Sequence, residues 1–128
     1  MEDKLITTAI EMLDRAYVPY SHFPVGAALE CADGSVYTGC NVENASYGLC
    51  ICAERTAAVK AVSEGHRDFK RIVIAGNSED YCTPCGACRQ FLYEFAPGME
   101  IICLNAKREA MKTTLSALLP HGFGPEHL

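Results

Sequence analysis

The sequence predicts an α/β fold in which a mixed β-sheet is covered by helices on both faces. The chain has 128 residues, which suits one compact domain and is too small for two independent hydrophobic cores. Apolar positions at helical spacing alternate along it with short apolar runs typical of buried strands. No internal repeat, low-complexity tract or linker interrupts this alternation. We therefore expect residues 1–128 to form a single domain.

The first predicted elements are a helix and a β-hairpin. Apolar residues recur at helical spacing over Leu5–Ala16, and we expect this helix to end before Val18-Pro19. Two strand-like runs, Val25–Cys31 and Val36–Cys40, flank the turn signal Ala32–Ser35. These runs are predicted to pair as antiparallel strands.

The rest of the chain alternates between helix and strand patterns, which favours parallel neighbouring strands joined by right-handed crossovers. Small alanines allow the first of these helices to pack closely, and Gly65 suits its end. The predicted elements are a helix over Cys52–Glu64, a strand over Lys70–Gly76, a helix over Cys85–Phe95, a strand over Ile101–Leu104, a short strand over Glu109–Thr113 and a small helix over Leu115–Leu119.

Charge and composition exclude several functional classes. Eleven basic and sixteen acidic residues give a net charge of -5, opposite to the basic surface of polynucleotide binders. No apolar run approaches the roughly 20 residues that span a bilayer, and Met1–Lys4 carries acids where a signal peptide carries bases. We therefore expect a cytoplasmic protein with neither nucleic acid nor membrane as partner. In that reducing compartment, eight cysteines indicate metal binding or catalysis rather than disulfides.

Three of the cysteines are placed to bind one metal ion. Cys85 and Cys88 are separated by one helical turn at a predicted helix start, so their sulfurs share one face. Cys52 opens the preceding helix, one helix, strand and loop earlier in the chain. The unpaired N–H groups and the dipole at a helix N-terminus stabilise thiolates. Three protein ligands leave the fourth position of zinc for water, as in catalytic zinc sites.

Two residues near Cys52 extend this interpretation to catalysis. Glu54 begins the same helix and can transfer protons beside the open zinc position, where the metal makes hydroxide available near neutral pH. Three thiolates give the zinc centre a negative formal charge that weakens its Lewis acidity. Arg55 is the adjacent candidate to donate hydrogen bonds to the sulfurs and offset that charge. The pattern predicts zinc-dependent hydrolysis.

Three motifs carry a resemblance to a known family. They are Asn41-Val-Glu43-Asn44-Ala-Ser-Tyr47, Cys52-Ala-Glu54-Arg55 and Pro84-Cys85-Gly-Ala-Cys88-Arg89-Gln90. With them the chain resembles the small homotetrameric cytidine deaminases of the three-cysteine zinc type over nearly its whole length. The resemblance implies a three-layer α-β-α sandwich with a mixed five-stranded sheet. It also implies one Zn²⁺ per subunit, held by the three cysteines named above.

The resemblance further implies the reaction and the contacts with substrate. Cytidine and 2′-deoxycytidine would be deaminated to uridine and 2′-deoxyuridine in pyrimidine salvage, with zinc-bound hydroxide attacking C4, Glu54 shuttling protons and ammonia leaving. Phe23 would pack against the nucleoside, and the N–H of Ala53 would face the base carbonyl. Asn41 and Glu43 would bind the ribose hydroxyl. A carboxylate there would also repel phosphate, so nucleosides are expected to be better substrates than nucleotides or polynucleotides.

Two aromatic residues are expected to act between subunits. By the same resemblance, Tyr47 and Phe123 would complete the pocket of a neighbouring subunit in a homotetramer. Pattern alone gives ordinary core packing as the alternative for these two aromatics and for Phe23. Local hydrogen bonds in a turn are the alternative for Asn41 and the expected role of Asn44.

Other functions stay open from the sequence. Cys50 or Cys82 as a fourth ligand would close the metal and make a non-catalytic structural zinc module. Among enzymes, the alternatives are a deaminase of aminonucleoside antibiotics of the blasticidin type and a polynucleotide-editing deaminase. The acidic composition and Glu43 oppose the second of these. Packing is the role expected for the five cysteines outside the ligand set, which are Cys31, Cys40, Cys50, Cys82 and Cys103.

Overall fold

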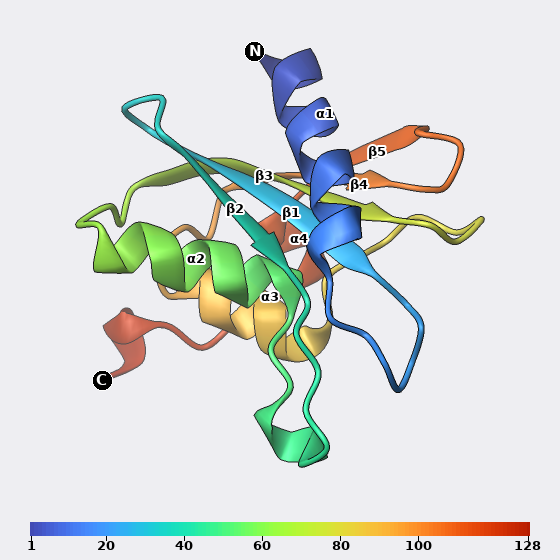
Figure 1. The fold of residues 1–128 in the computed structure, drawn as a ribbon. Coiled ribbons are helices and arrows are strands. Elements are labelled where there is room, and N and C mark those ends of the chain that lie inside the picture. The colour runs from blue at the N-terminus through green and yellow to red at the C-terminus, as the bar shows by residue number, and fades with distance from the viewer.

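Five strands form one mixed sheet in the computed structural model, which describes residues 1–128. The order across the sheet is β2-β1-β3-β4-β5 (Figure 1). Only β3 and β4 are parallel neighbours, and the other three pairs are antiparallel. The strands are β1 (Val25–Cys31), β2 (Val36–Cys40), β3 (Phe69–Gly76), β4 (Glu100–Leu104) and β5 (Ala110–Thr114).

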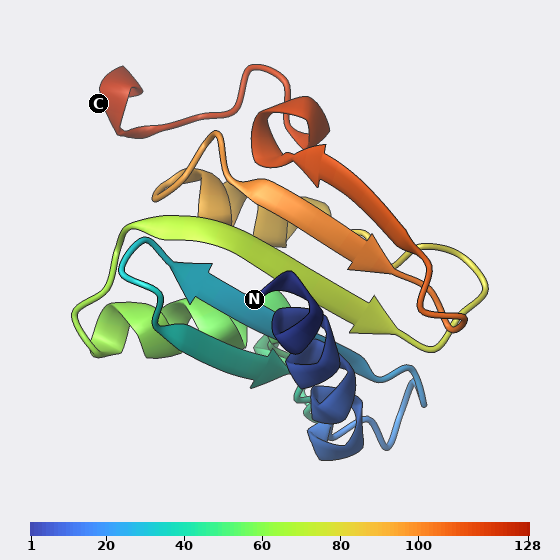
Figure 2. The same cartoon turned by 90° about the horizontal axis from the view of Figure 1, so that it is seen from above.

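Helices cover both faces of the sheet. Helix α1 (Glu2–Glu11) lies on one face, whereas α2 (Ala53–Ser63) and α3 (Gly86–Tyr93) lie on the other (Figures 1 and 2). Helix α4 (Leu115–Leu118) follows β5. The expected three-layer α-β-α sandwich with a mixed five-stranded sheet is confirmed. No helix is long and apolar enough to cross a bilayer.

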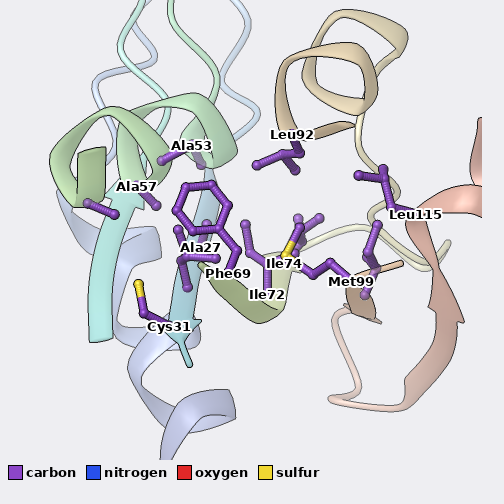
Figure 3. Packing of buried hydrophobic residues seen from close by; sticks show 14 of the residues in the cluster. Ala27, Cys31, Ala53, Ala57, Phe69, Ile72, Ile74, Leu92, Met99 and Leu115 are labelled. Atoms are coloured by element: carbon purple, nitrogen blue, oxygen red, sulfur yellow. The ribbon is translucent and has the colours of Figure 1, made fainter. Parts of the chain in front are cut away.

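The central strand β3 contributes to the core on both faces of the sheet. Ile72 and Ile74 face α2 and α3, while Val73 packs on the side of α1. Figure 3 shows Ile72 and Ile74 in one packed cluster with Ala57 of α2 and Leu92 of α3. Burial on both faces explains why the β3 sequence is a continuous apolar run rather than an alternating one.

A glycine in β2 sets the distance between α2 and the sheet. A Cβ on Gly39 would overlap the carbonyl oxygen of Ala53 and would lie 2.7 Å from the backbone nitrogen of Ala57. Ala53, Ala57 and Ala61 are fully buried along the contacting side of α2. Small residues on both elements therefore allow the helix to lie directly on the strand, as the alanine pattern predicted.

The hairpin has the predicted bounds, but several other element ends differ. The first α-helix ends at Glu11 and continues as a 3₁₀ turn over Met12–Arg15, a common way for a helix to tighten at its end. Ala16 is then extended, which ends the turn. Helix α3 ends at Tyr93 instead of Phe95, where the Phe95 N–H donates to the carbonyl of Leu92, three residues earlier, in the tighter geometry common in a last helical turn. The smaller shifts are α2 over 53–63, β3 from residue 69, α3 from residue 86, β4 from residue 100, β5 over 110–114 and α4 ending at residue 118.

The topology brings the starts of α2 and α3 to the same edge of the sheet. Strand β1 is antiparallel to both β2 and β3, so β2 and β3 run in the same direction with β1 between them. Helix α2 follows β2, and α3 follows β3. Both helices therefore begin at the carboxyl ends of strands, where α/β sheets usually place their ligand sites.

Candidate zinc and active site

Three cysteine sulfurs meet where α2 and α3 begin. Cys52 is the residue before α2, Cys85 is the residue before α3, and Cys88 lies in the first turn of α3. Their Sγ atoms all lie within 4.8 Å of one another, and those of Cys52 and Cys85 are 3.8 Å apart. Two sulfurs on a tetrahedral zinc, each at about 2.3 Å from it, are separated by roughly 3.8 Å. The cluster therefore fits one zinc ion.

A cation compensates part of the negative charge that these sulfurs can carry. Arg55 donates from Nη2 to the Cys52 Sγ at 3.5 Å. The pKa of Cys52 is lowered to about 5, first because the neighbouring Cys88 thiol hydrogen-bonds its thiolate and then through Arg55 and Cys85. The same hydrogen bond with Cys52 raises the pKa of Cys88. The lowered pKa of Cys52 favours its thiolate, the form in which cysteine binds a metal.

Glu54 is a buried carboxyl next to this cluster. It is the second residue of α2, and only 4% of its surface is exposed. Burial raises its pKa to about 7, and the negative charge of the Cys52 thiolate acts in the same direction. A carboxyl group near this value can accept and release a proton at neutral pH.

A cleft opens beside Glu54 and connects most of the predicted site residues. Its volume is about 190 Å³. Val25 and Thr83 are lining residues that the sequence interpretation did not include, and Cys82, which it considered only for packing or as a fourth ligand, also lines the cleft. Cys82 and Thr83 directly precede the Pro84-Cys85 motif, which was the available signal. The predicted residues that line the cleft are Phe23, Asn41, Cys52, Ala53, Glu54 and Cys85.

Asn41 connects the strand-to-helix loop to the start of β1. Its Oδ1 accepts from the Val25 N–H, and its Nδ2 donates to the Phe23 carbonyl, both at 2.9 Å. These partners lie far from Asn41 in the sequence, so its role is not that of a local turn residue. Asn44 does form the expected local bond, because its Oδ1 accepts from the Ser46 N–H.

Glu43, Tyr47 and Phe123 lie outside the cleft that contains Glu54. Glu43 and Tyr47 instead line a separate hollow of about 320 Å³. Hydrogen bonds from Ser21 and from the Tyr20 N–H lower the pKa of Glu43. Tyr47, in the loop that projects below the sheet in Figure 1, is 73% exposed, and Phe123 is 54% exposed.

The remaining cysteines form no fourth ligand to the cluster. The eight cysteines are all free, and the group that can hold a metal contains only Cys52, Cys85 and Cys88. The Cys50 sulfur accepts from the Asn44 N–H instead. Cys31 and Cys103 are buried, as expected for packing. The structure therefore gives no support to a closed, four-ligand zinc module.

Comparison with known proteins decides the family. Residues 1–104 match the model of the cytidine and deoxycytidylate deaminase zinc-binding region. The chain belongs to the cytidine and deoxycytidylate deaminase family. It is an enzyme of hydrolytic deamination, and its three-cysteine cluster fits one Zn²⁺ per subunit.

Similar members of the cytidine deaminase family extend the match to nearly the whole chain. A cytidine deaminase from Sporosarcina psychrophila is 48% identical over 127 residues, covering 98% of this chain and 93% of the relative. A probable cytidine deaminase from Dictyostelium discoideum is 50% identical, covering 98% and 86%. The crystal structure of a cytidine deaminase from Burkholderia pseudomallei has 45% identity and a TM-score of 0.93, covering 96% of this chain and 99% of that one.

Proposed function

We propose that this enzyme deaminates free cytidine and 2′-deoxycytidine to uridine and 2′-deoxyuridine, releasing ammonia, as a cytoplasmic step of pyrimidine salvage. In this proposal residues 1–128 act as one catalytic domain. The observation that carries it is the buried Glu54 carboxyl in a cleft next to a three-sulfur cluster with no fourth protein ligand.

Each residue of the cluster has a distinct role in the proposed reaction. Cys52, Cys85 and Cys88 hold the zinc, which when bound acts as a Lewis acid and lowers the pKa of a coordinated water. Glu54 would carry two protons in turn, the first from the attacking water to the ring nitrogen of the base and the second from the resulting C4 hydroxyl to the departing amine. Arg55 lowers the negative charge on the sulfurs through its bond to Cys52.

The proposed substrate contacts follow the cleft outward from Glu54. The Ala53 N–H is one of the groups left without an intrahelical partner at the start of α2, and we assign it to the base carbonyl. Phe23 packs against the nucleoside. After its two bonds to the backbone, the Asn41 side chain can still donate one hydrogen bond and accept one. In this proposal Asn41 and Glu43 bind the ribose hydroxyl.

We also propose a homotetramer in which subunits share active sites. Tyr47 and Phe123 are exposed and lie outside their own subunit's cleft, so they are available to a neighbour. Tyr17, Val42 and Ile51 add exposed apolar surface, and isolated β-bridges place them side by side. Exposed apolar patches of this kind are typical of protein interfaces.

Loss of Phe123 tests the shared site. We expect truncation after Pro120, or Phe123→Ala in the full chain, to lower kcat/KM for cytidine by about tenfold or more, because an aromatic contact with substrate is lost. Zinc content is expected to stay near that of the unaltered enzyme, since Phe123 is outside the sulfur cluster. Steady-state kinetics and elemental analysis measure the two quantities. Unchanged turnover would remove Phe123 from the proposed site.

A panel of amines tests the substrate class. Purified zinc-loaded enzyme is mixed with cytidine, 2′-deoxycytidine, cytidine monophosphate or blasticidin S, and ultraviolet absorbance and ammonia are followed. We expect loss of the cytidine band with both nucleosides and much slower turnover of the nucleotide, because Glu43 repels its phosphate. Zinc binding without nucleoside turnover would contradict the proposal, and turnover of blasticidin S alone would replace it with the antibiotic-deaminase function.

A further inference from the structure

Arg89 makes an unusual pair of contacts beside the sulfur cluster. It follows Cys88 in α3, and its half-buried guanidinium binds two backbone carbonyls. Nε donates to the Pro84 oxygen at 2.7 Å, and Nη1 donates to the Leu118 oxygen at 2.9 Å. No carboxylate forms an ion pair with Arg89. The charged guanidinium therefore donates two hydrogen bonds to the main chain. Because the donor is charged, these bonds are stronger than hydrogen bonds between neutral groups.

The first of these contacts fixes the chain just before Cys85. Residues 77–85 contain no helix or strand, and Pro84 has no N–H with which to hold itself in place. Cys85 precedes α3 without a side-chain capping bond. The main-chain N–H of Arg89 donates to the Cys85 carbonyl at 3.0 Å. Arg89 thus binds two successive carbonyls, those of Pro84 and Cys85.

The second contact connects this loop to the C-terminal part of the chain. Leu118 is the last residue of α4, where a carbonyl lacks an intrahelical partner and a cation is favourable. Helix α4 is itself anchored, because Leu115 is fully buried and its N–H donates to the Met99 carbonyl at 2.9 Å. Arg89 therefore bridges from an anchored helix, beyond the residues that match the family model, to the loop carrying Cys85.

We propose that Arg89 is a positioning residue of the metal centre, which holds the Cys85 sulfur at zinc-binding distance from Cys52 by clamping Pro84 to α4. It acts through the backbone, in contrast to Arg55, which contacts a sulfur directly. Without the clamp, the segment before Cys85 keeps the burial of Pro84 and the hydrogen bond from the Cys82 N–H to the Leu104 carbonyl. The link from the Pro84 carbonyl to α4 is lost, so the 3.8 Å separation of the two sulfurs is less firmly imposed before the metal arrives. The ligands must then be ordered at the expense of binding free energy.

Metal binding by two variants of Arg89 tests the proposal. Arg89→Gln removes the positive charge and the planar guanidinium with its separately directed N–H groups. Arg89→Lys keeps the charge but presents a single ammonium instead. Arg67→Gln is the matched control, since Arg67 is exposed and makes no side-chain hydrogen bond or ion pair. Zinc affinity is measured by competition with a chelator. The thiolate-to-metal absorption of the Co²⁺-loaded protein reports the geometry of the sulfurs.

We expect Arg89→Gln to weaken zinc binding by about 10 to 100-fold, the usual effect of removing a group that orients a ligand, and to alter the Co²⁺ spectrum. Arg89→Lys should recover part of the affinity, and Arg67→Gln should match the unaltered protein. If Arg89→Gln does not fold, the comparison of Arg89→Lys with the control carries the test.

Unchanged affinity and spectrum in both Arg89 variants would overturn the proposal. Circular dichroism measures the unfolding of the metal-free protein. If unfolding fully explains the loss of zinc affinity, the proposal is also overturned, because Arg89 is then only a structural residue. The inference rests on the three-sulfur zinc site of the proposed function. Its readouts measure the binding of zinc and cobalt without substrate. A failure of this inference can therefore be distinguished from a failure of the proposed deaminase function in the amine panel.

Discussion

Glu54→Gln is expected to lower kcat/KM for cytidine by roughly 10³ to 10⁴-fold, the range that a positioned acid and base contributes. The amide has nearly the same shape as the buried carboxyl, so the cleft keeps its volume. The amide cannot, however, accept and release a proton at neutral pH. Zinc content should not change, because Glu54 is not one of the three clustered ligands. Ultraviolet assays of turnover and elemental analysis of zinc measure the two effects separately.

Glu64→Gln is the matched control for this prediction. Glu64 follows the last residue of α2 and is exposed, so the same chemical change there should leave turnover and zinc content at the values of the unaltered enzyme. Substantial activity in Glu54→Gln would assign the proton transfers to another group. A large loss of zinc in that variant would mean that Glu54 supports the metal rather than the reaction.

Cys88→Ala should remove both the metal and the activity. Cys88 is fully buried, and the group that can hold a metal contains only Cys52 and Cys85 besides it. With two ligands left, we expect less than one tenth of the zinc of the unaltered enzyme after dialysis against a chelator. Turnover should fall by about a thousandfold or more, because the Lewis acid is lost. Elemental analysis and the ultraviolet assay on the same samples test both effects.

Substitution of a cysteine outside the cluster is the control for Cys88→Ala, because it shows what the loss of any one thiol does to zinc content and turnover. Cys40 donates its thiol to the Arg15 carbonyl and lies outside the sulfur cluster, so Cys40→Ala should keep its zinc and its turnover. A Cys88→Ala enzyme that binds a full equivalent of zinc and retains activity would show that Cys88 is not a ligand.

Local pattern was sufficient to predict most of the elements and the cysteines that the fold brings together. Apolar periodicity located the strands of the hairpin, and the three cysteines are recognisable because each stands at or near a helix start, with Cys85 and Cys88 one turn apart. Glu54 could be placed in the same way, since its position on α2 relative to Cys52 is set by helix geometry.

Contacts between segments distant in the sequence could not be predicted in this way. Nothing in the residues around Gly39 indicates that the carbonyl of Ala53 will occupy the space of its missing Cβ. In the sequence, Arg89 has the pattern of an ordinary helical arginine. Only the fold shows that its guanidinium donates to the Leu118 carbonyl. The bonds of Asn41 to Phe23 and Val25 depend in the same way on the closing of β1 against β2.

The position of β1 between β2 and β3 has a consequence for the order of folding. Cys52 follows β2 and Cys85 follows β3, so their sulfurs meet only after two antiparallel pairings with β1 have formed. Closing such long-range contacts costs chain entropy before any metal can contribute binding energy. We therefore expect the zinc ion to be captured late, by a sheet that has already assembled, unlike zinc fingers, whose small domains fold only around the metal. A cell short of zinc would then accumulate a folded, inactive enzyme that the ion alone can restore.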